Sequence, residues 1–168
     1  MKEIKCYTPS NAKGVDFYHG IEYNITMKKY KIAIDTNVIV SSLRSKNGYS
    51  YKLLSMIEDE RIKVFISVPV ILEYEDTIKR EKSNIIFKKS EIDNFLDFIC
   101  LIGKQRKIHY LWRPFLKDRK DDMFLELAVE SECDFIITFN KRDFEGTEKF
   151  GIRTLTPKEF FKVIGEEI

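Results

Sequence analysis

KYKIAIDTNVIVSSL, residues 29–43, contains a short apolar run, residues 32–34, that is followed directly by Asp35, Thr36 and Asn37. A short run rich in β-branched residues that is broken by a polar cluster predicts a buried strand with a carboxylate at its C-terminal end. In open parallel sheets, ligands bind at that end of the strands. The stretch therefore predicts a strand and, at its end, a candidate site acid.

Four more segments are typical of short strands, and helical segments alternate with them. Strands alternating with helices predict an α/β domain with a mostly parallel sheet and right-handed crossovers. The pattern by itself does not give the strand order. The further strands are expected at residues 64–66, 107–112, 134–138 and 152–155.

Local signals predict where several of the helices begin and end. Polar side chains that can accept a backbone N–H, and Pro in the first turn, are typical of helix starts, whereas Gly is typical of helix ends. These signals are Ser67 with Pro69, a weaker capping box from Ser90 to Asp93, a stop at Gly103, and a capping box from Thr156 to Glu159 around Pro157.

The length of 168 residues and a hydrophobic content of 43% suffice for one domain with a sizeable core. Residues 1–28 are interpreted as an N-terminal extension, either disordered or pinned as an extra strand, and residues 29–168 as the domain. The chain contains no apolar stretch long enough for a membrane span and no apolar core of a signal peptide near its start. We therefore expect a cytoplasmic protein.

The formal net charge of +2 says little about partners, because 33% of the residues are charged. The places where basic residues gather are more informative, and some of these residues could contact phosphate groups. The basic clusters comprise Lys28, Lys29, Lys31, Lys88, Lys89, Lys104, Arg106, Lys107, Arg113, Lys117, Arg119 and Lys120.

Several kinds of site lack support in the sequence. The three cysteines are far apart and have no His or Cys partner at zinc spacing, so they are interpreted as reduced thiols. The two histidines have no partner motif for a nucleophilic triad, and no glycine-rich phosphate loop is present. Trp112 and the phenylalanines are interpreted as core, although Trp112 or Tyr30 could lie at the rim of a cleft. The residues concerned are Cys6, Cys100, Cys133, His19 and His109.

Acidic or amide side chains stand at four predicted strand ends or helix starts. If they converge, several carboxylates crowd into one pocket, where like charges raise one another's pKa values unless a cation is present. Hard oxygen ligands select Mg²⁺ or Mn²⁺, and the natural reaction of such a site is metal-assisted hydrolysis of a phosphodiester. The four places are Asp35 with Asn37, Glu73, Asp121 with Asp122, and Asn140 with Asp143.

Each candidate also has a purely structural interpretation. Asp35 with Asn37 could form a turn, and Asp143 could be an ordinary loop acid. Glu73 could be a solvated helix residue, and periodicity does not choose between it and Glu75. The acidic pair at residues 121–122 could simply cap a helix.

Taken together, four segments resemble PIN-domain ribonucleases in order and spacing, most closely the branch that contains the toxins of toxin–antitoxin pairs. The resemblance covers roughly residues 30–160. It implies a three-layer α/β/α sandwich in which the first and fourth strands are neighbours. The segments are IAIDTNVIVSSL (32–43), SVPVILEYEDTI (67–78), DRKDDMFLELAVESECDFIITFN (118–140) and KRDF (141–144).

The resemblance assigns roles to individual residues. It implies that Asp35 is the first acid and a principal metal ligand, that Glu73 rather than its neighbour is the second acid, and that Asp122 is the third, with Asp121 nearly equivalent. Asn37 and Thr138 match the polar residues that support the first acid.

The sequence departs from the family pattern at Asn140, where many relatives carry Asp. An amide brings no charge and cannot act as a base, but Asp143 could supply that charge. The substitution puts a second metal ion in question, so catalysis with one metal ion is expected.

The resulting hypothesis is an endoribonuclease that depends on Mg²⁺ or Mn²⁺, acts on single-stranded or looped RNA, and is the toxin of a toxin–antitoxin pair. Metal-binding residues would be Asp35, Asp122 and Glu73, with Asn140 and Asp143 completing the acidic ring. A cognate antitoxin protein, and by resemblance a homodimer, would be partners. The alternative hypothesis is a PIN-like module that binds RNA or protein without cleaving, and Asn140 is the residue that favours it.

Overall fold

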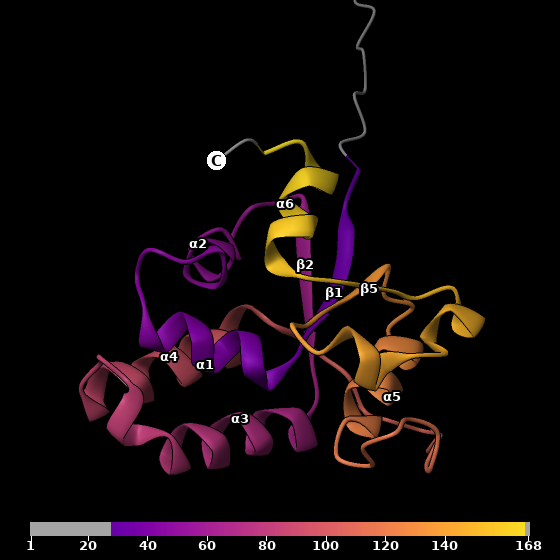
Figure 1. Ribbon diagram of the computed structural model, residues 1–168, viewed down its shortest axis with the longest axis horizontal. Coiled ribbons are helices and arrows are strands. Elements are labelled where there is room, and N and C mark those ends of the chain that lie inside the picture. Colours follow the sequence, from indigo (N-terminus) through magenta and orange to yellow (C-terminus); the bar gives the residue numbers. More distant parts are fainter. Residues whose placement is uncertain (1–27, 167–168) are drawn as a thin grey trace, which may run out of the picture.

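The computed structural model describes residues 28–166 and contains a five-stranded sheet flanked by helices (Figure 1). The predicted N-terminal extension therefore lies almost entirely outside the described residues. The strands are β1 (Tyr30–Ile34), β2 (Ile62–Ile66), β3 (Lys104–Gln105), β4 (Phe135–Ile137) and β5 (Arg153–Leu155). The helices are α1 (Thr36–Arg44), α2 (Tyr49–Ser55), α3 (Val68–Arg80), α4 (Lys89–Ile102), α5 (Asp122–Glu130) and α6 (Pro157–Ile164), with short 3₁₀ helices η1 (Lys82–Asn84), η2 (Lys141–Phe144) and η3 (Thr147–Phe150).

The strand order is β3-β2-β1-β4-β5, and every pair is parallel. The α/β prediction and the expected pairing of the first and fourth strands are both confirmed. Because the chain moves from β1 towards β3 and then returns to β4, the order reverses between β1 and β4. This reversal is the topological switch point at which α/β sheets bind ligands.

Apolar residues in β1, β2 and β4 form the centre of the core, as their near-continuous apolar runs require in a parallel sheet covered by helices. Helix α5 packs against these three strands, α1 packs against α2 and α3, and α6 packs against β5 and α2. Phe160 of α6 makes edge contacts with the rings of Tyr30 and Phe135, which joins the last helix to both central strands. None of the helices in residues 28–166 is long and apolar enough to span a membrane.

The prediction of a strand at residues 107–112 was wrong. The third strand is the short β3, and the following segment has no regular secondary structure. The backbone N–H groups of His109 and Trp112 donate to the Glu130 and Glu126 carboxylates of α5 instead of to a neighbouring strand. The backbone of this segment therefore bonds to side chains of α5 instead of to a neighbouring strand. The local sequence does not indicate such long-range hydrogen bonds.

The helix starts agree with the predictions in position but differ in their hydrogen bonds. Ser67 is the N-cap of α3, but its buried hydroxyl has no hydrogen-bond partner among residues 28–166. Helix α4 begins at Lys89, and its capping carboxylate is Glu91, which accepts the N–H of Lys88 (2.7 Å), so the predicted pair of Ser90 and Asp93 was wrong. The Gly103 stop and the capping box from Thr156 to Glu159 are confirmed.

Tyr74 of α3 ties that helix to the end of the central strand. Its ring is buried against Phe124 of α5, and its hydroxyl donates to the carbonyl oxygen of Ile34, the residue before Asp35. A buried tyrosine hydroxyl needs such a partner. The contact fixes the C-terminal end of β1 relative to α3.

We predict that Tyr74→Phe lowers the free energy of unfolding by about 1–3 kcal/mol, because a buried carbonyl loses its hydrogen-bond donor. Urea denaturation followed by circular dichroism measures the change. Tyr49→Phe is the control, since the structure gives the Tyr49 hydroxyl no hydrogen bond within residues 28–166, and its effect should stay within about 0.5 kcal/mol. Equal effects of the two substitutions would contradict the role of the Tyr74 contact.

Candidate functional site

Asp35 lies where β1 ends and α1 begins. It is the N-cap residue of α1, its backbone N–H donates to the carbonyl of Ile137 in β4 (2.9 Å), and only 5% of its surface is exposed. The C-terminal end of β1 thus delivers its carboxylate to the positive end of a helix at the switch point.

Thr138 and Asn37 hold this carboxylate in place. Asp35 Oδ2 accepts hydrogen bonds from the Thr138 hydroxyl and from Asn37 Nδ2, both at 2.6 Å. The Thr138 hydroxyl in turn accepts from Asn37 Nδ2 (3.2 Å) and from the backbone N–H of Asn140 (2.9 Å). The structure therefore brings three of the predicted residues into direct contact and connects them to a fourth.

Asp143 acts on Asp35 through its charge, and Asp35 in turn acts on Asp121. Burial raises the pKa of Asp35, the nearby charge of Asp143 raises it further, and the hydrogen bond from Thr138 opposes both effects. Burial also raises the pKa of Asp121 to about 7, with further contributions from the charges of Asp35, Asp118, Asp143 and Asp122. Three elements, the β1 end, the start of α5 and η2, therefore contribute aspartates to one electrostatically coupled cluster. We call Asp35, Asp121 and Asp143 the aspartate cluster.

Asp121 and Asp122 have different surroundings although they are adjacent. Asp121 is the N-cap of α5 and is partly exposed, whereas Asp122 is fully buried. Asp122 Oδ1 accepts the backbone N–H groups of Leu116 (2.8 Å) and Phe115 (3.2 Å), and its Oδ2 has no hydrogen-bond partner in the described part of the chain. One acid therefore faces the cluster, while the other fixes the preceding segment and keeps one free oxygen.

Glu73 lies on α3 next to Tyr74 and is half-buried. Its Oε1 accepts from the Thr77 hydroxyl (2.8 Å) and lies 3.3 Å from Arg80 Nη2. These partners belong to its own helix. Its predicted role as the second acid would require the carboxylate to exchange them for a ligand.

Asn140 follows β4 and is exposed, and its side chain brings no charge to the site. The η2 turn after it carries Asp143, whose backbone N–H donates to the Asn140 carbonyl (2.9 Å). This turn explains how Asp143 influences the pKa values of both Asp35 and Asp121.

The donor set fits a hard divalent cation. Crowded carboxylates, one of them with a pKa near 7, and an unpartnered buried carboxylate oxygen at Asp122 are what a cation would relieve. Within residues 28–166, no group of three or more His, Cys, Asp or Glu side chains is arranged to hold an ion by itself. An open site of this kind suits Mg²⁺, which usually keeps several waters and binds substrate phosphates.

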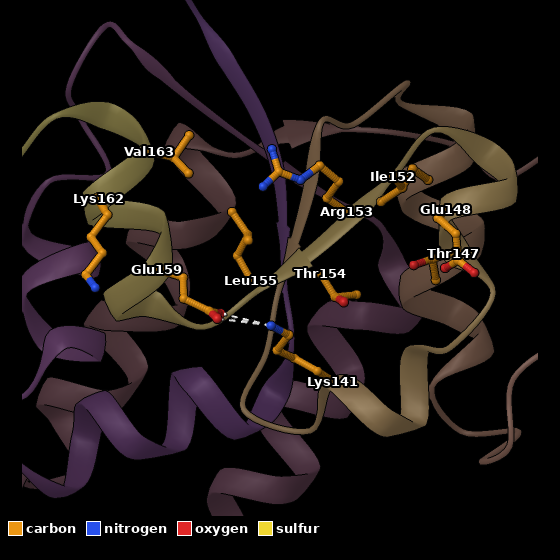
Figure 2. Close-up of a pocket in the computed structure, with 10 residues that line it drawn as sticks. All are labelled: Lys141, Thr147, Glu148, Ile152, Arg153, Thr154, Leu155, Glu159, Lys162 and Val163. Atoms are coloured by element: carbon orange, nitrogen blue, oxygen red, sulfur yellow. Dashed lines mark hydrogen bonds and ion pairs between the residues drawn. The ribbon is translucent and has the colours of Figure 1, made fainter.

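A cavity of about 510 Å³ lies along β5 and α6 (Figure 2). It is lined by Lys141, Arg153 and Lys162 among others, and by none of the predicted site residues. Lys141 extends towards this cavity and pairs with Glu159 of α6 (3.0 Å), as Figure 2 shows. This lysine therefore does not neutralise the cluster.

The sequence of the chain matches a known protein family. The sequence profile described as "PIN domain" matches residues 31–142, which is more than half of the chain. The chain belongs to the PIN-domain family. The matched region contains Asp35, Asp121 and Asn140 and ends shortly before Asp143. PIN domains are in general metal-dependent nucleases that act on RNA.

The PIN domain described here is also similar to an uncharacterized protein of Methanocaldococcus jannaschii, MJ1680. The two sequences are 23% identical over 146 residues, which cover 80% of this chain and 91% of that protein. The likeness extends along nearly the whole relative.

The sequence did not single out Tyr74 as part of this PIN-domain site. Tyr74 lies on the buried face of α3, and its hydroxyl fixes the β1 end. Burial and the charge of Asp35 raise its pKa, which places the ring close to the site. A tyrosine rather than a phenylalanine on a buried stripe is the available signal.

We predict that Asp121 makes the metal-free protein less stable as pH rises from about 4 to about 7. Its pKa is higher in the folded than in the unfolded chain, so the folded state binds the proton more tightly and loses that advantage on deprotonation. In chelator, Asp121→Asn should be more stable than the wild type above pH 7 by roughly 1–3 kcal/mol, less than the full shift because Asp121 is partly exposed.

Urea denaturation across this pH range measures the effect, and Asp76→Asn on the exposed face of α3 is the control. Parallel stability curves for wild type and Asp121→Asn would show that Asp121 is not coupled to the cluster.

Proposed function

We propose that the protein is an endoribonuclease that hydrolyses RNA phosphodiester bonds with Mg²⁺ or Mn²⁺. The observation that supports it is the aspartate cluster, in which carboxylates from three separate elements influence one another at the switch point of a PIN domain. Uncompensated carboxylates are costly to hold together, and a divalent cation offsets that cost.

Within this proposal, Asp35 and Asp121 are the main metal-binding residues, and Asp143 supplies the charge that Asn140 lacks. Thr138 and Asn37 orient Asp35. A bound divalent ion would lower the pKa of an attacking water and neutralise charge that develops on the phosphate. The sequence-based assignment favoured Asp122 over Asp121, and the greater exposure of Asp121 together with its raised pKa supports the reverse order.

Glu73 and Asp122 remain proposed site residues, but each would have to act in a particular way. Glu73 would bind the ion after releasing Thr77 and Arg80, and the exposure of the Arg80 side chain allows that release. Asp122 would act through its unpartnered Oδ2 or by holding the backbone before Asp121. The charge of Asp143 replaces that of the missing acid at residue 140, and one metal ion suffices for this arrangement.

The biological role that we propose is the toxin of a toxin–antitoxin pair. Its partner would be a small antitoxin protein that inserts a basic side chain among the carboxylates, and the toxin would form a homodimer. This part rests on the resemblance of the four sequence segments to toxin-type PIN domains. Growth arrest on expression of the wild type, but not of Asp35→Ala, would support it, and equal growth would oppose it.

A non-cleaving module that binds RNA or protein is the second candidate function. The neutral, exposed side chain of Asn140 at the end of β4 favours it, because a site with less negative charge binds a metal ion more weakly. Cleavage measurements separate the two candidates.

We predict that the purified protein cleaves single-stranded RNA only with Mg²⁺ or Mn²⁺ and stops when chelator is added. Asp35→Asn and Asp121→Asn should each lower the rate by more than about 100-fold, and Thr138→Val by about 10–100-fold because it loosens Asp35. Asp122→Asn keeps an oxygen for the two backbone N–H groups and should stay within about 10-fold of the wild type.

Gel analysis of a labelled RNA under single-turnover conditions measures these rates, and Asp76→Asn is the matched control on the surface. A wild type that binds RNA without cutting it would favour the second candidate. Loss of cleavage in Asp122→Asn but not in Asp121→Asn would restore Asp122 as the third acid.

A further inference from the structure

The segment between β3 and α5 runs along α5 towards the aspartate cluster. His109 contacts Glu130 at the C-terminal end of the helix, Nδ1 to Oε1 at 2.9 Å. Trp112 and Arg113 contact Glu126 one turn earlier, and the N–H groups of residues 115–116 contact Asp122 at the helix start. The order of these contacts shows that the segment is antiparallel to α5 and ends at the start of that helix.

Four aromatic side chains form a continuous row on this segment and on η3. The ring centroids of Tyr110 and Trp112 are 4.7 Å apart, those of Trp112 and Phe150 are 4.8 Å apart, and those of Phe150 and Phe115 are 5.1 Å apart. We call these four residues the aromatic row. The contacts with α5 place Tyr110 far from the cluster and Phe115 near it.

The aromatic row differs from the core aromatics in its exposure. Tyr110 is 63% exposed and Trp112 is 36% exposed, whereas Phe124, Phe144 and Phe160 are almost fully buried. The row also lies apart from Figure 2's cavity, whose lining contains none of its members. Tyr110 and Trp112 are thus exposed, whereas Phe115 and Phe150 are partly buried against the core, and the prediction that Trp112 belongs to the core does not hold.

The near end of the row lies close to Gly146 in the turn after η2. Phe115 precedes Leu116, whose N–H is held by Asp122, and its ring lies within van der Waals reach of Gly146, three residues after Asp143. Gly146 has a φ of 96°, and an added Cβ would lie 3.3 Å from the Phe115 ring, so glycine lets the turn pass close to it. Lys149 Nζ lies 5.8 Å from the centre of the same ring.

The segment that carries three of the four rings is rich in basic residues. Residues 104–120 contain one acid, Asp118, and seven basic residues: Lys104, Arg106, Lys107, Arg113, Lys117, Arg119 and Lys120. Arg113 is paired with Glu126, whereas the structure gives Lys107, Lys117 and Arg119 no ion pair within residues 28–166. Exposed aromatic faces beside unpaired cations are the combination that binds single-stranded nucleic acids.

We propose that the aromatic row binds unpaired nucleobases of single-stranded RNA by stacking and leads the strand into the aspartate cluster. This inference rests on the proposed ribonuclease function and adds a preference for unpaired RNA on one side of the scissile bond. The length of α5 from residue 122 to residue 130 is ~12 Å at ~1.5 Å per residue, which is enough for two or three nucleotides. A duplex does not offer its base faces, so it binds this row poorly.

Trp112 gives a direct test because it is the one tryptophan of the sequence. Its fluorescence should be quenched in a saturable manner by a single-stranded RNA of about 10 nucleotides, with chelator present to prevent cleavage, and much less by a duplex of the same length. Tyr110→Leu should weaken binding of the single strand by about 5–100-fold, because leucine keeps the apolar bulk but has no π face.

Two control substitutions separate the effect of the aromatic ring from effects on folding and on the size of the side chain. Tyr110→Phe keeps the ring and should bind like the wild type, and Leu111→Ala removes a neighbouring exposed apolar side chain and should also leave binding unchanged. Absence of quenching by single-stranded RNA would overturn the proposal and leave the row as a surface for a protein partner. Equal binding by Tyr110→Leu and Tyr110→Phe would overturn it as well.

These results separate the inference from the proposed function. Quenching of Trp112 without any cleavage would retain the aromatic row and reject the nuclease. Cleavage with an unchanged KM for single-stranded RNA in Tyr110→Leu would retain the nuclease and reject the row.

Discussion

The hydrogen bond from the Thr138 hydroxyl to the Asp35 carboxylate joins residues that are 103 positions apart in the chain. It forms because β1 and β4 are parallel neighbours in register, with Ile34 opposite Ile137, so the residue after each strand lies at the same edge of the sheet. Asp35 is buried, and burial of an unpartnered carboxylate is costly. The pairing of these two strands is therefore the condition for the whole site.

Around this bond the protein holds two carboxylates with raised pKa values, those of Asp35 and Asp121. Asp35 stands at the start of α1 and Asp121 at the start of α5, so the positive ends of two helices face the same region. That field reduces the repulsion between the two acids, yet the pKa of Asp121 still rises to about 7. The site is therefore less stable than a neutral one would be, and binding of a cation would recover the difference.

Asp121 and Asp122 are adjacent and chemically identical, but they have different roles in this fold. Sequence composition and spacing do not distinguish Asp121 from Asp122, because both residues suit the start of a helix. The segment that lies along α5 donates two backbone N–H groups to Asp122. Asp121 is instead coupled to Asp35 through its charge. Residues 107–112 of the same segment were predicted to be a strand. Their backbone instead bonds to the carboxylates of α5, and Tyr110 and Trp112 are exposed.

The sequence by itself determined the α/β class, the positions of β1, β2, β4 and β5, and the candidate acids, because apolar periodicity, capping residues and strand-end polar clusters are local signals. Only the tertiary structure decided that Asp143 acts on Asp35, that Asp121 is coupled to Asp35, and that Tyr110 and Trp112 are exposed. These outcomes depend on which side chain, distant in sequence, becomes the hydrogen-bond partner of each buried polar group. That choice is made by packing of α5 and η2 against the sheet, and no local pattern records it.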